Sequence, residues 1–250
     1  MVNSPRGQRN ILVAIPAYNE SATVGTVIAA VKNAAPHAHI LVVDDGSVDS
    51  TAVNARAAGA VVLTLPFNVG VGGAMRTAFL YALEGGYDAV VQVDADGQHN
   101  PEQIIGLCEN LDTADVVVGA RFVPGESDDY QVHGPRKWAM VVLSKILSKV
   151  TKTELSDTTS GFRAAGPRAI KLFAQHYPSE YLGDTVESLL IAHRAGLTIV
   201  QTPARMSERQ GGEASQNTVS STLYLGRALL AITVALTRKT GAAEKEGAIL

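Results

Sequence analysis

Cysteine is almost absent from this 250-residue sequence: the single residue, Cys108, excludes an internal disulfide and a zinc site built from cysteines. Cys108 falls in a helical pattern of apolar residues with Ile104 and Leu111, so a buried thiol is the favoured interpretation and a reactive thiol is the alternative. Hydrophobic residues make up 46% of the chain and charged residues 18%, which is typical of a folded protein. We therefore expect a hydrophobic core to hold the fold together without covalent cross-links.

Long apolar runs and a strong net charge are missing as well. Residues 1–10 have no apolar core of the kind that a secretory signal peptide needs. The longest apolar run, 228–236, is interrupted by Thr233 and falls well short of the roughly 20 residues that span a bilayer. The formal net charge of -3 gives no overall attraction to nucleic acid. We therefore expect a cytoplasmic protein that binds no nucleic acid and whose contact with a membrane is peripheral, at the inner face.

Two glycine-rich nucleotide-binding motifs are also absent. An apolar strand over 11–15 stops at Pro16, and Ser21 is placed to cap the following helix. A dinucleotide-binding Rossmann protein would carry Gly-x-Gly-x-x-Gly between these two elements, and no glycine occurs there. No Gly-x-x-x-x-Gly-Lys-Ser/Thr loop occurs anywhere in the chain. The sequence thus argues against a dehydrogenase and against a P-loop nucleotide hydrolase.

Acidic residues follow two of the apolar strands that are present. One apolar run, 90–93, ends in Asp94 and Asp96, and an earlier one ends in Asp44 and Asp45. In open α/β sheets, ligands bind at the carboxyl ends of the strands. There, Asp44 and Asp45 would accept hydrogen bonds from a base or a ribose. The alternative is that these stretches only form turns or cap the helices that follow.

Asp96 and Gln98 offer the oxygens of a half-filled site for a hard divalent cation. Such a cation takes a few protein oxygens and leaves its other positions to water or to a substrate phosphate. A glycine-rich stretch, 70–73, precedes a helix, and its glycines would allow a nucleotide to approach the start of that helix closely. The alternative is a tight loop between strand and helix. The sequence therefore predicts a metal and a phosphate-bearing ligand at one edge of a sheet.

Strands and helices alternate along the first half of the chain. Strands are predicted over 40–43, 61–65 and 116–120, a helix over 50–58, and a further helix start at Asn100. This order predicts an α/β fold.

One domain is expected over 10–217, after a disordered N-terminus, 1–9. An apolar helix over 218–240 and a frayed tail, 241–250, complete the chain. The apolar stripe of that helix would pack on the domain or on a partner, or lie in a membrane interface.

Four stretches stand out by their order and spacing: Ile15-Pro16-Ala17-Tyr18-Asn19-Glu20, Val42-Val43-Asp44-Asp45-Gly46-Ser47, Val93-Asp94-Ala95-Asp96-Gly97-Gln98-His99 and Gly119-Ala120-Arg121-Phe122. Together they resemble the inverting glycosyltransferases of family 2. The form Asp-Ala-Asp-x-Gln-His is most similar to the branch of dolichyl-phosphate mannose and polyprenyl-phosphate sugar synthases. The resemblance spans residues 10–215 and implies the GT-A fold, a Rossmann-like, mostly parallel sheet flanked by helices.

The resemblance also implies roles for individual residues. The donor nucleotide sugar would be held by residues at strand ends and in the loops that follow them, namely Pro16, Ala17, Tyr18, Glu20, Asp44, Asp45, Gly70, Asp94, Ala95, Arg121 and Arg209. Asp96 and Gln98 would bind Mg²⁺ or Mn²⁺. The residues expected to act in catalysis are Asp96, Glu187, Asp184 and Arg209. For Glu187 the alternative is a structural one, because an acid at a helix start is stabilised by the helix dipole. Ser215 lies in the same stretch as Arg209 but comes one residue later than the serine of the synthases. The resemblance therefore implies a role for Arg209 but not for Ser215.

The expected activity is a metal-dependent, inverting transfer of a sugar from a UDP-, GDP- or dTDP-sugar, with a polyprenyl phosphate as the first-ranked acceptor. A second hypothesis has a hydroxyl acceptor on a saccharide, lipid or small metabolite, with Glu187 or Asp184 removing its proton. A third, of another class, is a catalytically silent subunit that binds the nucleotide sugar as a scaffold. Expected partners are the donor, a lipid phosphate at a membrane surface, and a membrane protein or a second copy bound through the C-terminal helix.

Overall fold

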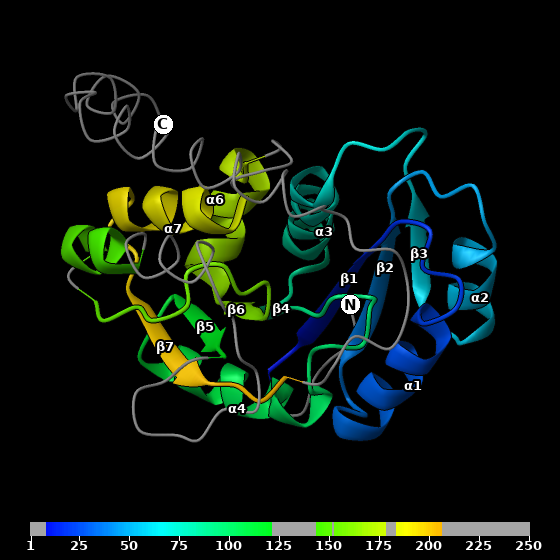
Figure 1. Ribbon diagram of the computed structural model, residues 1–250, viewed down its shortest axis with the longest axis horizontal. Helices are drawn as coiled ribbons and strands as arrows, with labels where there is room; N and C mark the ends of the chain where they lie inside the picture. The colour runs from blue at the N-terminus through cyan, green and yellow to red at the C-terminus, as the bar shows by residue number, and fades with distance from the viewer. Residues whose placement is uncertain (1–8, 122–143, 152, 179–183, 207–250) are drawn as a thin grey trace, which may run out of the picture.

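The computed structural model describes residues 9–121, 144–151, 153–178 and 184–206. Within these ranges, seven strands form one sheet in the order β3-β2-β1-β4-β6-β5-β7 (Figure 1). Neighbouring strands run parallel except at β6, which is antiparallel to both β4 and β5. The strands are β1 (Ile11–Ala17), β2 (His39–Asp44), β3 (Val61–Thr64), β4 (Ala89–Gln92), β5 (Val116–Ala120), β6 (Arg163–Ala165) and β7 (Ile199–Pro203). The predicted α/β fold with a mostly parallel sheet is confirmed.

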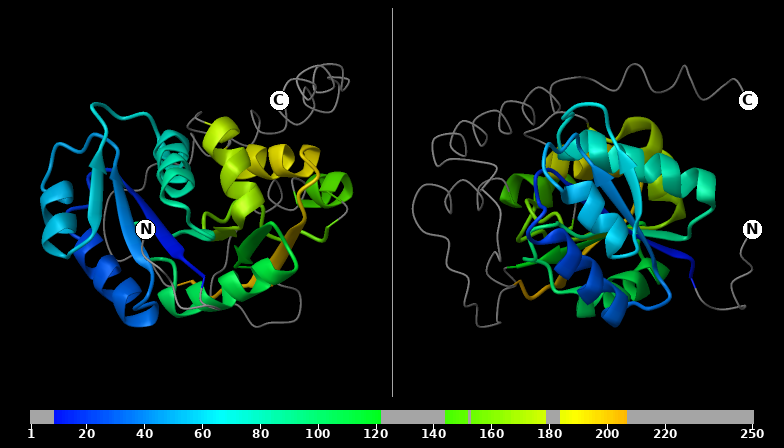
Figure 2. Two further views of the ribbon diagram at one scale, coloured as in Figure 1. Left: turned by 180° about the vertical axis from the view of Figure 1, so that it is seen from behind. Right: turned by 90° about the vertical axis from the view of Figure 1, so that its right-hand side faces the viewer.

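Helices cover both faces of this sheet. They are α1 (Val24–Ala34), α2 (Thr51–Ala57), α3 (Val71–Gly85), α4 (Ile104–Glu109), α6 (Pro167–His176) and α7 (Asp184–Arg194). Figures 1 and 2 show α3, α6 and α7 over one face and α1 and α4 over the other, and each layer encloses its own hydrophobic core. The inner strands of the sheet are therefore buried on both faces, and the ends of these strands are where a ligand can approach them.

The central strand β4 shows why its sequence is a continuous apolar run. Val90 packs into the core beneath α3 and α6, and its neighbour Val91 packs into the core beneath α1 and α4. Both side chains are buried, and each contributes about 1.5–3 kcal/mol by leaving water. The strand is thus held firmly from two sides just before the chain reaches Asp94.

The connection from β1 to α1 differs from the prediction. β1 continues through Pro16 to Ala17, because the fixed φ of proline fits an extended strand and its missing N–H costs one bond near the strand end. The helix starts at Val24 rather than after Ser21. The backbone N–H of Ser21 donates to Asp49 Oδ2 at 3.2 Å, whereas Thr23 N and Val24 N donate to the carbonyl of Glu20, at 3.2 Å and 3.0 Å.

Several other expectations fall in or near the second half of the chain. Cys108 is buried, and burial raises the pKa of its thiol to about 12. The prediction of a buried rather than a reactive thiol is therefore confirmed.

Helix α6 was not predicted. Residues 144–151 are helical. The proposed C-terminal helix, 218–240, and tail, 241–250, lie outside the described residues, as does Arg209. No helix in the described ranges combines the length and the apolar character needed to cross a membrane.

Candidate functional site

The loops that follow β1 and β2 are hydrogen-bonded to each other at the carboxyl end of the sheet. Asn19 N donates to Ser47 Oγ at 2.9 Å, and Asn19 Oδ1 accepts from Val48 N at 3.0 Å. Asn19 has a φ of 55°, a conformation that asparagine adopts more readily than most residues. The preceding residue, Tyr18, is 46% exposed. Its ring therefore lies at the rim of these two loops, where a ligand can reach it.

Asp45 joins the second of these loops to the third, which leads into α3. Its carboxylate oxygens accept from Val69 N and Gly70 N, both at 2.8 Å. Burial raises the pKa of this carboxyl, and the two hydrogen bonds oppose that effect. Gly70 has a φ of 87°, which residues with a side chain rarely adopt. The glycine-rich stretch is thus a tight loop fixed by Asp45, and both Asp45 oxygens face its backbone.

Asp44 and Glu20 lie in the same cluster of loops. Asp44 is buried, and its Oδ1 accepts from Ser47 N at 3.1 Å. Glu20 Oε2 accepts from Thr23 Oγ1 at 3.0 Å, and Glu20 N donates to Thr51 Oγ1 at 2.8 Å. The structure therefore brings these acids to the edge that carries Tyr18 and the end of β1. Their contact with a nucleoside stays a prediction.

Asp94 lies where β4 leaves the sheet beside β1. The chain builds outward from β1 through β2 to β3 and then returns to place β4 on the other side of β1, which makes a topological switch point. Asp94 Oδ1 accepts from Gln92 Nε2 at 3.1 Å, and Asp94 N donates to His99 Nδ1 at 3.0 Å. The next residue, Ala95, is buried in the core beneath α1 and α4. The carboxylate of Asp94, 38% exposed, is therefore held at the crevice where ligands bind in such sheets.

Asp96 and Gln98 form a turn around Gly97, whose φ is 77°. Asp96 Oδ1 accepts from Gln98 N at 3.0 Å, and both residues are half-buried. In the described ranges no group of three or more His, Cys, Asp or Glu side chains forms a complete metal site. One carboxylate and one amide oxygen suit a hard cation that takes its other ligands from water and phosphate. The two residues therefore fit Mg²⁺ or Mn²⁺, and a turn at this point is compatible with that role.

Arg121 is engaged by a buried carboxylate. Its Nε donates to Asp157 Oδ2 at 2.7 Å, and its Nη2 donates to Asp157 Oδ1 at 3.0 Å and to Thr159 Oγ1 at 2.8 Å. Burial disfavours the charged form of Asp157, but the hydrogen bonds and the charge of Arg121 outweigh it and lower the pKa below its usual value. Arg121 thus fastens the end of β5 to the turn before β6, and its predicted contact with a phosphate stays a prediction.

Arg163, in β6, ties that turn to the start of α7. Its guanidinium donates to the carbonyl of Thr158 at 2.9 Å, to the carbonyl of Ser160 at 2.8 Å and to Ser188 Oγ at 3.0 Å. It also donates to the carbonyl of Thr185 at 2.6 Å. These bonds satisfy a cation that is only 8% exposed, and they fix the first turn of α7 relative to the sheet.

The two acids of α7 differ sharply in burial. Asp184 is buried, and its Oδ2 has no hydrogen-bond partner. Burial raises the pKa of Asp184 to about 6, with Arg163 opposing the rise and the negative charge of Asp94 adding to it. Glu187 is exposed. The structure therefore associates Asp184 with Asp94 and Arg163, whereas Glu187 is open to solvent.

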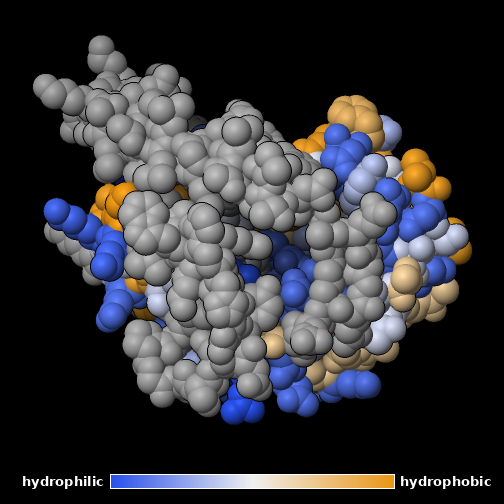
Figure 3. Space-filling view, in the orientation of Figure 1, coloured by the Kyte–Doolittle hydropathy of each residue, from blue (hydrophilic) through white to orange (hydrophobic). Residues whose placement is uncertain are grey.

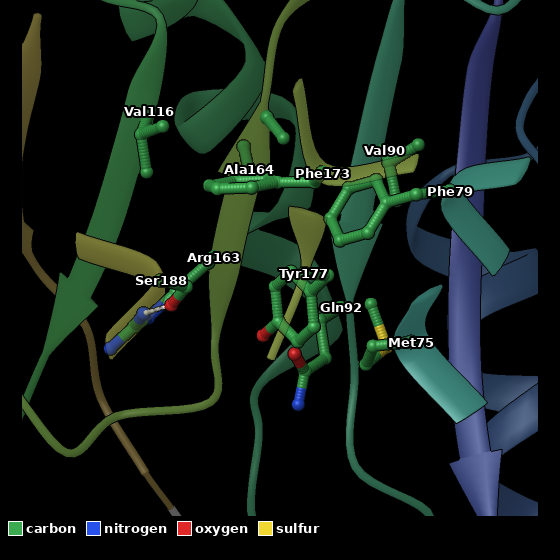
Figure 4. A pocket seen from close by; sticks show the side chains of 11 residues that line it. Met75, Phe79, Val90, Gln92, Val116, Arg163, Ala164, Phe173, Tyr177 and Ser188 are labelled. Atoms are coloured by element: carbon green, nitrogen blue, oxygen red, sulfur yellow. Dashed lines mark hydrogen bonds between the residues drawn. The ribbon is translucent and has the colours of Figure 1, made fainter. Parts of the chain in front are cut away.

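A small cavity lies behind this region (Figure 4). Its walls include Met75 and Phe79 of α3 and Phe173 of α6, and the polar ends of Gln92 and Tyr177 lie at its lower side in the view shown. Burial raises the pKa of Tyr177 above its usual value. The cavity has room for about one water molecule, which is far too little for a sugar. A ligand of that size therefore does not fit in this cavity.

The surface offers a polar area for such a ligand. In Figure 3, hydrophilic residues gather near the middle of the face, while hydrophobic ones are seen toward its upper right and left margins. Polar side chains in such an area can form hydrogen bonds with a charged or hydroxylated ligand.

Three supporting residues had no role of their own in the sequence-based prediction: Gln92, His99 and Arg163. Gln92 ends a strand of apolar residues that the sequence predicted, whereas Arg163 begins a strand that it did not. A polar side chain in a buried strand must find hydrogen-bond partners, and this requirement could have identified Gln92 but not Arg163. His99 carried no such signal beyond its place in the acidic motif.

Comparison with known proteins points to one family. Residues 12–172 match the model of a family described as Glycosyl transferase family 2. An undecaprenyl-phosphate mannosyltransferase of Micrococcus luteus is 36% identical over 217 residues, covering 83% of this chain and 87% of that protein. A polyprenol monophosphomannose synthase of Mycolicibacterium smegmatis is 32% identical over 219 residues, covering 83% of this chain and 81% of that protein.

A solved structure supports the fold. Glucosyl-3-phosphoglycerate synthase of Mycobacterium tuberculosis, in complex with Mn²⁺, UDP and phosphoglyceric acid, matches with a TM-score of 0.66 at 23% identity. The match covers 90% of this chain and 78% of that one. It confirms the predicted GT-A fold.

Proposed function

We propose, since the chain belongs to glycosyl transferase family 2, that it transfers a sugar from a nucleoside-diphosphate donor to a polyprenyl phosphate, with mannose as the first-ranked sugar. Membership of this family makes the chain a glycosyltransferase. The finer proposal rests on its likeness, over 83% of its length, to two enzymes whose names specify undecaprenyl phosphate or polyprenol and mannose.

The donor would lie across the crevice between β1 and β4. In this arrangement its nucleoside contacts Tyr18, the end of β1 and Asp44, and its ribose or sugar contacts the half-exposed carboxylate of Asp94. The diphosphate lies beside Asp96 and Gln98. The order of these residues along one sheet edge supports the proposal, because it gives base, sugar and phosphate separate neighbours.

In an inverting transfer, negative charge grows on the departing diphosphate while the acceptor attacks from the other side of the sugar. A divalent cation held by Asp96 and Gln98 would stabilise that charge, a contribution of several kcal/mol. Arg209 would add a second positive charge.

A polyprenyl phosphate needs no base to attack. Its phosphate oxygen already carries a negative charge at neutral pH, because the second pKa of a phosphate monoester is near 6. The exposed Glu187 is then dispensable for the chemistry. A lipid-linked acceptor also requires the enzyme to work at a membrane surface, which matches the expected peripheral location.

One observation favours a hydroxyl acceptor as the second candidate. Asp184 is buried, has an oxygen without a hydrogen-bond partner and has a pKa of about 6. A carboxylate with such a pKa is ionised at neutral pH and still basic enough to take a proton from an alcohol during attack. In this alternative the acceptor is a saccharide, lipid or small metabolite, and Asp184 or Glu187 serves as general base.

The proposal is tested by measuring transfer from a panel of UDP-, GDP- and dTDP-sugars, GDP-mannose included, to undecaprenyl phosphate in detergent, with Mn²⁺ or Mg²⁺. Thermal unfolding with each donor gives a second measurement, because a ligand at 100 times its Kd adds about 2.7 kcal/mol of stability. Sugar recovered on the lipid phosphate supports the proposal. Transfer to hydroxyl acceptors alone would support the second candidate, and donor binding without turnover on any acceptor would support the scaffold hypothesis.

A further inference from the structure

His99 is buried beside Asp94 and contacts it at two points. The ring Nδ1 accepts a hydrogen bond from Asp94 N at 3.0 Å, and the ring Nε2 lies 3.5 Å from Asp94 Oδ2. Because Nδ1 accepts from a backbone N–H, the ring hydrogen of the neutral tautomer is on Nε2. That hydrogen is on the nitrogen nearest to the carboxylate. One ring therefore fixes both the backbone and the side chain of Asp94.

The imidazole ring of His99 is itself fixed by two other parts of the fold. It stacks on Phe162, with 4.9 Å between the ring centres and 26° between the ring planes. The His99 backbone pairs with Met206, just beyond β7. With only 3% of its side chain exposed, the ring has little freedom to take up another rotamer.

Two further residues, Gln92 and Gly161, also confine the carboxylate of Asp94. Gln92 Nε2 donates to its Oδ1 at 3.1 Å. Gly161 leaves room for it, since a Cβ at that position would come within 3.1 Å of Asp94 Oδ2 and 3.2 Å of Oδ1. Gln92, Gly161 and His99 thus surround a carboxylate that is 38% exposed. This arrangement limits the directions in which its accessible oxygen atoms can point.

We infer that His99 is a positioning residue, which acts through Asp94 to orient a hydroxyl of the bound donor. The inference rests on the proposed function, in which Asp94 contacts the ribose or the sugar of the donor. A carboxylate that must accept a hydrogen bond in one direction works best when its orientation is set before the ligand arrives. A displacement of about 1 Å at such a group lowers a rate by up to about 100-fold.

Three substitutions separate the contacts of the ring. His99→Phe keeps a ring to stack on Phe162 and removes both polar contacts. His99→Asn offers an amide oxygen in place of Nδ1 and removes the group near the carboxylate. His99→Gln offers an amide N–H in place of Nε2 and removes the acceptor for the backbone. We expect His99→Phe to lower kcat/KM for the donor by about 10- to 100-fold, and His99→Asn and His99→Gln to lower it less.

The deciding measurement is a double-mutant cycle with Asp94→Ala, read both as kcat/KM and as the Kd of the donor sugar nucleotide in the full-length chain. If His99 acts through Asp94, His99→Phe has an effect in the parent and little further effect when Asp94 is already alanine. Equal losses in both backgrounds, or a parent-like His99→Phe, would overturn the inference. If His99→Phe does not fold by thermal unfolding, His99→Asn takes its place in the same cycle. Failure of the proposed function looks different, because it appears in the parent itself. The parent would then bind no donor, transfer sugar to hydroxyl acceptors alone, or bind a donor without turnover on any acceptor.

Discussion

Arg121 and Asp157 are 36 residues apart in the sequence and form a two-point ion pair at the carboxyl end of the sheet. The Asp157 side chain is fully buried, and the Arg121 side chain is 16% exposed. The pair connects the end of β5 with the turn that leads into β6, whose Arg163 in turn fixes the start of α7. The ion pair therefore supports the part of the site that carries Asp184 and Glu187.

Asp157→Ala should destabilise the protein by about 3–5 kcal/mol, because it leaves the Arg121 cation without its buried partner. The free energy of unfolding in urea measures this loss. Arg168→Ala is the matched control, since Arg168 also pairs with an aspartate, Asp115, but is 63% exposed. Its loss should cost less than about 1 kcal/mol. Equal effects of the two substitutions would contradict the role given to the buried pair.

The pair also predicts an acid-sensitive step. The folded-state pKa of Asp157 lies below its usual value of 3.8, so its stabilisation is complete above that value and is lost as the pH falls through the lower, folded pKa. Below pH 4 the unfolding free energy of the parent should decline more steeply than that of Asp157→Asn. Parallel curves for the two proteins would argue against a lowered pKa.

Gly46→Ala should destabilise the loop that carries Asp44 and Asp45. Gly46 has a φ of 73°, and an added Cβ would lie 2.8 Å from the backbone carbon of Phe67. Backbone atoms cannot shift away from the new Cβ without a large cost in free energy. We therefore expect the free energy of unfolding to fall by about 2 kcal/mol or more and donor binding to weaken. Urea unfolding and donor titration measure the two effects.

Gly25→Ala is the control for this substitution. Gly25 lies inside α1 with open space where its Cβ would be, so alanine there should stabilise the protein by about 0.5–1 kcal/mol. If both alanines behaved alike, the positive φ at Gly46 would not be the constraint that we infer.

Asp184 should make the stability of the protein fall as the pH rises. Its folded-state pKa of about 6 lies above the usual 3.8, so the stability it contributes is fully present below 3.8 and is lost as the pH passes through about 6. Asp184→Asn removes this titration. Between about pH 3.5 and 7.5, the parent should lose about 3 kcal/mol relative to the variant. A pH-independent difference in unfolding free energy would show that Asp184 titrates normally.

Glu187→Gln tests whether Glu187 serves as the general base for a hydroxyl acceptor. With a polyprenyl phosphate, turnover should stay within about threefold of the parent, because an acceptor that is already an anion needs no general base. A loss of about 100-fold or more would instead identify a hydroxyl acceptor with Glu187 as its base. Glu109→Gln is the control, since Glu109 is also exposed but lies on α4, across the sheet from α7.

Local patterns in the sequence were sufficient to predict much of the fold. The continuous apolar run of β4 predicted a buried strand, and β5 has the bounds that were predicted. Asn100 caps the turn that begins at Pro101 by accepting from Glu102 N, as expected from its position. In each case the determining residues lie within a few positions of one another, so burial and capping can be deduced from neighbours.

Contacts between distant residues were beyond such reasoning. β6 has only three residues, begins with an arginine and runs antiparallel, so no local pattern identified it. The partner of Arg121 is 36 residues away and was not predicted, because nothing in the sequence around Arg121 indicates it. Asp45 illustrates the same limit, since the sequence suggested a ligand contact and could not show that its oxygens hold the backbone of Val69 and Gly70.

The most direct test of the account is the rate of sugar transfer to undecaprenyl phosphate, in the presence of Mn²⁺, by the parent protein and by Asp96→Ala. We predict transfer by the parent and a loss of at least about 100-fold in the variant, because the diphosphate would leave without its main source of charge stabilisation. Unfolding of the two proteins at the same urea concentration would show that the variant is folded. An Asp96→Ala protein as active as the parent would contradict the account.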